Sequence, residues 1–192
     1  MTSPLARELE GIHNFRSLAP YPLQGGGRIR PSMVFRSGAL ELMTDDDRAW
    51  LENEARIAMV LDLRHPDEMG AGTGHRLACG VPPLSLFPQA SRQEDLIAEL
   101  NGLYGAGPSP GRYFHYLAMG GAQFARAFEL LADARSYPVL VHCTAGKDRT
   151  GVLLALLMDL LGARDEDIAA EYGLSDESID RLIAYLQRTG RV

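Results

Sequence analysis

One stretch predicts the fold of this chain: VLVHCTAGKDRTG, at residues 139–151. It begins in an apolar run of strand length, from Pro138 to Val141, with β-branched residues on both sides of Leu140. After it, residues 152–161 are apolar nearly all round until Gly162, as is typical of a helix buried on every side. The sequence therefore predicts a tight turn, carrying a thiol and three charged side chains, between a buried strand and a buried helix.

The backbone of such a turn is suited to binding an anion. The first N–H groups of a helix have no partner inside the helix, and a preceding loop can aim its own amides at the same point. The helix dipole adds partial positive charge there. A cysteine in this environment ionises more readily, so we expect Cys143 to be a thiolate nucleophile. We expect the residues that hold the phosphate to be Thr144, Ala145, Gly146, Lys147 and Arg149.

Three side chains of the turn suit phosphoryl transfer. The planar guanidinium of Arg149 can hold two phosphate oxygens at once. An ionised Asp148 would repel the ligand, so we expect it to bind substrate in its protonated form and to give its proton to the leaving oxygen. Thr150 can hydrogen-bond the sulfur and make it a better leaving group in the second step.

Lys147 is the single lysine among 19 basic residues, and the others are arginines. A compact ammonium approaches a phosphate in a crowded loop more easily than a guanidinium does. This compositional contrast supports a role for Lys147 in binding the anion.

The string HCTAGKDRTG resembles the Cys-x5-Arg loop of the protein-tyrosine phosphatase superfamily, and in particular the bacterial tyrosine phosphatase branch with a GKDR loop, which includes phosphoinositide-active members. The resemblance implies that Cys143 is the nucleophile, Arg149 the phosphate-binding arginine, Lys147 the loop lysine and Asp148 a general acid placed in the loop itself. It also implies an α/β fold with a central, mostly parallel sheet of four or five strands flanked by helices. His142 would tune the thiolate and fix the loop.

Stretches upstream also resemble this branch, among them NFR at residues 14–16 and FRSGAL at residues 35–40. Arg16 and Arg36 can each be read as solvated strand arginines, and the alternative for Arg36 is that it braces the catalytic loop. Asp62 lies at the end of a predicted strand and is followed by Glu68, in a pattern that resembles the branch. It either orders the site or caps the strand end.

The remaining pattern alternates strands with helices, which indicates an α/β fold. Triple glycine at residues 25–27 predicts a hairpin that leads into a strand over 28–36. The aromatic residues of the helix that begins at Tyr113 are typical of a core, although Tyr113 or Tyr116 could line the pocket. Strands are also expected over 57–63 and 81–87, and helices over 44–55, 89–100, 113–134, 165–172 and 175–189.

Composition limits the functions open to the chain. Its 192 residues predict one domain, residues 1–192, and the net charge of −6 argues against nucleic acid as a partner. Residues 1–10 lack a signal-peptide core, and no run is long enough for stable membrane insertion, so we expect a cytoplasmic protein.

The two cysteines of the chain are too few to form a disulfide framework. Cys79 is either a small buried side chain or a reversible disulfide partner of Cys143. The histidines lack metal-ligand spacing, and we expect neither a metal nor a cofactor.

The leading hypothesis is a metal-independent phosphatase that acts on phosphomonoesters through a cysteinyl-phosphate, with phosphotyrosine as substrate and dual specificity open. The alternative substrate is a phosphoinositide, which the charge of Lys147 favours. A catalytically silent phosphate-binding module would usually lack Cys143, Asp148 or Arg149. Sulfur transfer and arsenate reduction also use a cysteine in an anion-binding loop. Neither reaction needs the acid at Asp148, so its presence favours an oxygen leaving group. An ATPase-type phosphate loop is excluded, because Lys147 is followed by Asp148 rather than Ser or Thr. The sequence does not predict an oligomeric state.

Overall fold

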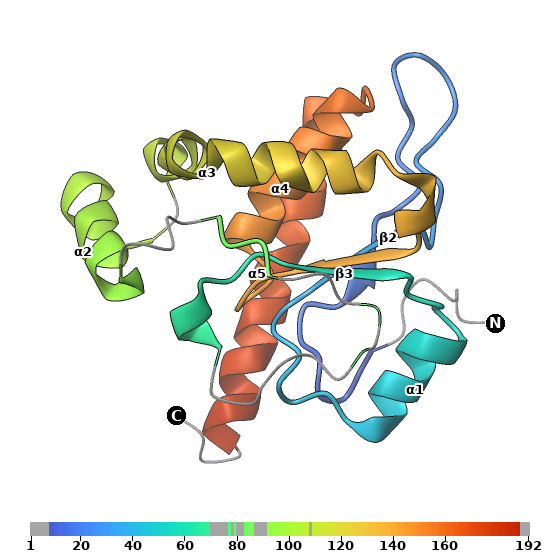
Figure 1. The fold of residues 1–192 in the computed structure, drawn as a ribbon, viewed down its shortest axis with the longest axis horizontal. Helices are drawn as coiled ribbons and strands as arrows, with labels where there is room; N and C mark the ends of the chain where they lie inside the picture. The colour runs from blue at the N-terminus through green and yellow to red at the C-terminus, as the bar shows by residue number, and fades with distance from the viewer. Residues whose placement is uncertain are drawn as a thin grey trace.

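The computed structural model describes residues 8–69, 77, 79, 83–86, 92–107 and 109–188, apart from the side chains of residues 93, 177 and 179–188. Its elements are shown in Figure 1. In chain order they are β1 (Arg16–Ser17), β2 (Val34–Ser37), α1 (Asp45–Asn53), β3 (Met59–Asp62), the 3-10 helix η1 (Pro66–Glu68), α2 (Gln93–Tyr104), α3 (Pro110–Leu131), the 3-10 helix η2 (Ala134–Ser136), β4 (Val139–His142), α4 (Asp148–Leu160) and α5 (Asp165–Arg188).

The four strands of the described chain form one sheet in the order β1-β2-β4-β3. β4 lies at the centre and pairs in parallel with β2 and β3, whereas β1 pairs antiparallel with β2. This confirms the predicted α/β fold with a mostly parallel sheet. The register places Ser37 and Asp62 opposite His142, at the carboxyl ends of the three parallel strands. Open α/β sheets bind their ligands beyond this edge.

Helices cover both faces of the sheet (Figure 1). Because side chains of a strand alternate between faces, Val139 and Val141 pack into the core beneath α3 and α4, and Leu140 packs on the side of α1. All four residues of β4 are buried. A strand buried on both faces explains why residues 138–141 form a continuous apolar run rather than an alternating one.

Several predicted boundaries differ from the structure. The strand expected over 28–36 is confined to β2, although the glycine-rich turn before it does form, with Gly26 and Gly27 at positive φ. The strand expected over 81–87 is absent from its described residues, 83–86, where Leu84 N–H donates a single main-chain bond to Asp62 O. α4 is buried only as far as Met158, and Leu160 in its last turn is 74% exposed.

The largest correction concerns the C-terminal region. Two helices separated near Gly173 were expected, with Ser175 capping the second. The structure has one continuous helix, α5. Ser175 is buried within it, and its hydroxyl accepts a hydrogen bond of 3.0 Å from Arg16 Nη2. A glycine inside a helix costs only about 1 kcal/mol relative to alanine, and tertiary contacts of this kind override it.

Two features are absent from the described residues. None of the helices is both long and apolar enough to cross a bilayer. No group of three or more His, Cys, Asp and Glu side chains is arranged to hold a metal ion in this part of the chain.

Candidate active site

The loop between β4 and α4 turns its carbonyl groups toward the protein scaffold. The carbonyl of Thr144 accepts a hydrogen bond from Ala39 N–H at 2.9 Å, and those of Ala145 and Gly146 accept from Asn14 Nδ2 at 3.1 and 2.9 Å. A trans peptide holds its C=O and N–H on opposite sides. The amides of residues 145–148 therefore point away from the scaffold, and they make no hydrogen bond with the residues that the structure describes.

α4 begins at this loop without a side-chain cap. Lys147 occupies the N-cap position and makes no capping hydrogen bond, so the first amides of α4 are left to a ligand. Cys143 precedes the loop and is buried. The arrangement is a concave set of amides at a positive helix end, next to a thiol.

Gly146 is required by the shape of this loop. Its φ is +67°, a left-handed conformation that favours glycine. A Cβ at this position would also lie 2.2 Å from Ser37 O, which is too close for any side chain. The glycine therefore lets the loop pack directly on the end of β2.

Arg36 braces the loop from below. Its side chain is fully buried, and Nη2 donates to Gly146 O at 2.5 Å and to Lys147 O at 3.4 Å. Nη1 contacts Glu171 Oε2 at 2.5 Å, and Arg16 Nε contacts the other oxygen of Glu171 at 2.7 Å. Burial lowers the pKa of Arg36, and Glu171 opposes this effect. Both arginines are thus structural partners of the loop region rather than solvated strand residues.

Glu68, in η1, accepts hydrogen bonds from Arg149 through both of its carboxylate oxygens. Oε2 contacts Nη1, and Oε1 contacts Nη2 at 2.7 Å. Thr144 Oγ1 also donates to Oε1. Burial opposes ionisation of Glu68, but these hydrogen bonds and the arginine's charge outweigh it, so the pKa of Glu68 is lowered. The guanidinium is therefore held in one orientation by a carboxylate across the loop.

Asp62 and His142 form a second support under the loop. Asp62 accepts hydrogen bonds from Arg64, at 3.0 Å from the main chain and at 2.8 Å from Nη2, and Oδ2 lies 3.5 Å from His142 Nε2. Burial raises the pKa of Asp62, but the bonds to Arg64 and the charge of His142 outweigh it and lower the pKa overall. His142 Nδ1 lies 3.4 Å from Cys143 O, so Asp62 is linked through His142 to the residue that carries the thiol.

The two remaining charged side chains of the loop point toward α5. Asp148 Oδ1 accepts a hydrogen bond of 2.7 Å from the Tyr113 hydroxyl, and the Tyr172 hydroxyl lies 3.4 Å from the same oxygen. Lys147 Nζ contacts Asp176 Oδ1 at 2.6 Å, and this hydrogen bond raises the pKa of Lys147. The expectation that a tyrosine at the start of α3 lies near the loop is met by Tyr113.

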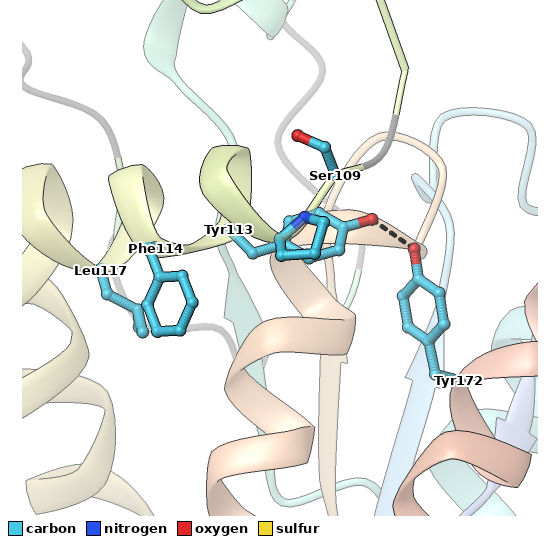
Figure 2. Close-up of a pocket in the computed structure, with 6 residues that line it drawn as sticks. Ser109, Tyr113, Phe114, Leu117 and Tyr172 are labelled. Carbon is cyan, nitrogen blue, oxygen red and sulfur yellow. Dashed lines mark hydrogen bonds between the residues drawn. The ribbon is translucent and has the colours of Figure 1, made fainter. Parts of the chain in front are cut away.

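Two apolar pockets adjoin the tyrosine pair. One, of about 450 Å³, is shown in Figure 2, where Tyr113 and Tyr172 bring their hydroxyls together. It is lined by Ser109, Pro110, Tyr113, Phe114, Leu117 and Tyr172. A second pocket, of about 340 Å³, shares the two tyrosines and extends along α4 and α5. Cys143 lines neither pocket. Both pockets therefore lie beside the catalytic loop and are not the site at which the thiol would react.

The structure corrects the expectation for Thr150 and places the second cysteine, Cys79. Thr150 Oγ1 is buried and has no hydrogen-bond partner among the described residues, so the expected bond to the sulfur is absent. Thr150 is the third residue of α4, where packing around the helix start decides the side-chain position. Cys79 is a free, partly buried cysteine that packs against the core on the α1 side, whereas Cys143 is buried in the core beneath α3 and α4.

The contribution of α5 to the site was not predicted from the sequence. Glu171, Tyr172 and Asp176 each contact the loop or its braces, and none stood out in the sequence. A continuous helical pattern through Gly173 would have placed Tyr172 and Asp176 on one face, since they are four residues apart, with Glu171 on the neighbouring side of the helix. Asn14 was also missed as a loop ligand, although it lay within a stretch that resembled the family.

Known proteins were compared with the chain. A model of the tyrosine phosphatase family matches residues 7–191. The triple specificity protein phosphatase PtpB of Mycobacterium tuberculosis is 32% identical over 205 residues, covering 93% of this chain and 72% of that protein. A tyrosine-protein phosphatase of Cupriavidus necator is 31% identical over 191 residues, covering 88% of this chain and 66% of that protein.

Among solved structures, the Siw14 catalytic core matches over 96% of both chains, with 15% identity and a TM-score of 0.44. A second structure of that domain, from S. cerevisiae, has a TM-score of 0.39 and 17% identity, over 94% of this chain and 96% of that chain. The family match over nearly the whole chain and the 32% identity to PtpB confirm the predicted resemblance. The chain belongs to the tyrosine phosphatase family and is a phosphatase.

Proposed function

We propose that this phosphatase hydrolyses phosphomonoesters in two steps through a cysteinyl-phosphate on Cys143. The observation that carries the proposal is the orientation of the loop, whose carbonyls 144–147 bind the protein so that its amides 145–148 are left for an anion. A nucleophilic sulfur at the mouth of such a loop attacks a phosphorus atom whose oxygens the amides hold.

In the first step the Cys143 sulfur attacks phosphorus as the bond to the leaving oxygen breaks, and Asp148 gives its proton to that oxygen. In the second step Asp148, now a carboxylate, takes a proton from water, and the water oxygen attacks phosphorus as the sulfur–phosphorus bond breaks. Arg149 and the loop amides stabilise the charge on the equatorial oxygens in both steps. No electron transfer is needed, and the residues named supply every proton.

We infer that phosphotyrosine is the preferred substrate. Lys147, the loop cation that would favour multiply phosphorylated headgroups, is paired with Asp176 at 2.6 Å. The aromatic pockets beside Asp148 also suit a substrate that brings an aromatic ring and apolar neighbours. The triple specificity relative supports a range broader than phosphotyrosine alone. A thiolate nucleophile needs a reducing compartment, so we place the protein in the cytoplasm.

The phosphoinositide alternative rests on Lys147 itself. The Lys147–Asp176 pair is at the surface, with Asp176 66% exposed, and such pairs contribute only about 0–1 kcal/mol. A headgroup with a second phosphate could therefore displace Asp176. Comparing kcat/KM for a phosphotyrosyl peptide, a phosphoseryl peptide and a short-chain phosphoinositide decides among the three substrates.

The mechanism is tested with p-nitrophenyl phosphate in the presence of a chelator, using wild type, Cys143→Ser and the control Cys79→Ser. We expect hydrolysis by wild type and Cys79→Ser, and none by Cys143→Ser, while vanadate still protects Cys143→Ser against thermal unfolding. Acid quenching of wild type during turnover should trap a phosphate adduct on the peptide that contains Cys143. Full activity of Cys143→Ser, or a requirement for metal, would refute the proposal.

A further inference from the structure

We propose that Tyr113 and Tyr172 position the general acid, holding Asp148 by its Oδ1 oxygen so that Oδ2 delivers the proton to the leaving group. This inference rests on the proposed function and assigns two positioning residues and one reactive oxygen within it. Both tyrosines lie outside the Cys-x5-Arg loop, on α3 and α5.

The hydrogen bonds form a chain that ends on one oxygen of the acid. Tyr113 OH donates to Asp148 Oδ1 at 2.7 Å, and Tyr172 OH lies 2.5 Å from Tyr113 OH but 3.4 Å from Oδ1. Each phenol has one proton to donate. Tyr113 has the shorter contact with the carboxylate, so its proton is the one in the hydrogen bond to Asp148 Oδ1. Tyr172 therefore donates to Tyr113, and the dashed line between their hydroxyls in Figure 2 is the outer link of this chain.

The other carboxylate oxygen differs from Oδ1. Asp148 Oδ2 makes no hydrogen bond with any residue that the structure describes, and Asp148 is partly exposed. One oxygen is thus anchored to the scaffold while its neighbour is open to a ligand. Only an oxygen without a protein partner can carry a proton to the leaving oxygen without first breaking a bond.

The two phenols remain proton donors under the conditions of catalysis. Burial, the hydrogen bond that Tyr113 donates to Asp148 and the charge of Asp148 raise the pKa of Tyr113 above its usual value. Burial also raises the pKa of Tyr172. A neutral phenol that donates to Oδ1 stabilises the carboxylate that remains once the proton has left, which is the form needed to activate water in the second step.

The fold holds the tyrosine pair against the start of α4. Tyr113 lies in the first turn of α3, and its ring meets that of Tyr172 edge-on with a centroid distance of 6.1 Å. Gly151 of the loop motif makes room for the second ring, since a Cβ there would lie 2.8 Å from Tyr172 Cδ2. A carboxyl on the first residue of a helix otherwise rotates about two side-chain bonds, and the phenols remove that freedom.

The test uses two substrates that differ in their need for a general acid. p-Nitrophenol is a good leaving group and departs without help, whereas phenol is a poor one and needs the proton. We would measure kcat/KM for p-nitrophenyl phosphate and phenyl phosphate with wild type, Tyr113→Phe, Tyr172→Phe, Asp148→Asn and Tyr113→Phe/Asp148→Asn. Tyr104→Phe is the matched control, because among the described residues its hydroxyl has His115 as its one hydrogen-bond partner, at 3.4 Å on the surface.

We expect Asp148→Asn to lose about 100-fold or more on phenyl phosphate and much less on p-nitrophenyl phosphate. Tyr113→Phe should lose about tenfold on phenyl phosphate, Tyr172→Phe less, and both should keep most activity on p-nitrophenyl phosphate. The double variant should lose no more than Asp148→Asn alone. Vanadate inhibition should be unchanged in all of them, because the amide loop is intact.

An equal loss on both substrates, or additive losses in the double variant, would show that the tyrosines only support the fold and would overturn the inference, as would full activity of Tyr113→Phe on phenyl phosphate. Failure of the proposed function has a different signature. In that case Asp148→Asn would itself show no dependence on the leaving group, or Cys143→Ser would remain active.

Discussion

Arg36 Nη2 donates a hydrogen bond of 2.5 Å to the main-chain carbonyl of Gly146, which lies 110 residues later in the chain. The arginine is fully buried and also pairs with Glu171. It thereby ties the end of β2 to the middle of the catalytic loop and to α5. Together with Asn14 and the Ala39 amide, this side chain holds the carbonyl side of a loop that must present its amides to an anion.

Replacing Arg36 should cost both stability and activity. We expect Arg36→Met to lower the free energy of unfolding by about 3–5 kcal/mol, because it leaves buried acceptors without their charged partner. The free energy is measured by urea unfolding, and activity under conditions where the variant is folded. Arg28→Met is the control, since Arg28 is exposed and, within the described part of the chain, its side chain donates a single bond of 3.4 Å, to Pro20 O. Equal stability of the two variants would contradict the bracing role.

Glu68 should act through Arg149. We expect Glu68→Gln to reduce kcat/KM for p-nitrophenyl phosphate by about 100-fold, because a neutral amide cannot hold both ends of the guanidinium and the arginine then loses its fixed position. Vanadate affinity should fall with it, as measured by competitive inhibition. Glu94→Gln, which removes an exposed carboxylate paired with Arg92, should leave both quantities unchanged.

The same carboxylates predict how stability depends on pH. The pKa values of Glu68 and Asp62 are lowered in the folded protein, so each contributes stability above the unfolded values of about 4 and loses it as the pH falls through the folded pKa. The difference in unfolding free energy between wild type and Glu68→Gln should therefore be largest near about pH 6 and shrink below about pH 4. Urea unfolding over this range measures it, and a difference that grows on acidification would contradict the assignment.

Asp176 should influence the choice of substrate. Asp176→Asn releases Lys147, so we expect kcat/KM for a short-chain phosphoinositide to rise about two- to fivefold relative to a phosphotyrosyl peptide, the range expected for an exposed ion pair. Glu166→Gln, another exposed acid of α5, serves as the control for net charge. An unchanged ratio would show that Lys147 does not contact the second phosphate.

Gly146 allows a sharper test of the loop than removal of any side chain. Gly146→Ala places a Cβ 2.2 Å from Ser37 O at a positive φ, so the loop must move. We expect loss of hydrolysis together with loss of protection by vanadate, whereas Cys143→Ser loses hydrolysis alone. Gly121→Ala, at a position with open space around it, should be nearly neutral in thermal unfolding and activity.

The pattern of the sequence was sufficient to predict the central strand, the loop that follows it and the α/β fold class. β4 is a continuous apolar run because both faces of the sheet are covered, and α4 is apolar because it lies between the sheet and its neighbours. Both properties are local in sequence, and so is the spacing from Cys143 to Arg149. The predicted ends of the helices were less accurate, because capping and packing compete there within one or two residues.

The residues that hold the loop could not be found in this way. Glu171, Tyr172 and Asp176 are ordinary in composition, and the pattern around Gly173 and Ser175 favoured a break in the helix. Their importance depends on contacts with Arg36, Tyr113 and Lys147, which are more than 25 residues away in the chain. Such pairings depend on how α5 packs on α4, and local helix propensity does not predict them.

By itself, therefore, the sequence determined which atoms could do chemistry: a thiol, a carboxyl, an ammonium and a guanidinium within one short loop. Only the tertiary structure decided which way each of them faces, because the loop carbonyls, the Arg149 guanidinium and Asp148 Oδ1 are each oriented by a partner from a distant element. Residue spacing is a property of the chain, whereas orientation arises when separate segments of the chain meet in the folded protein.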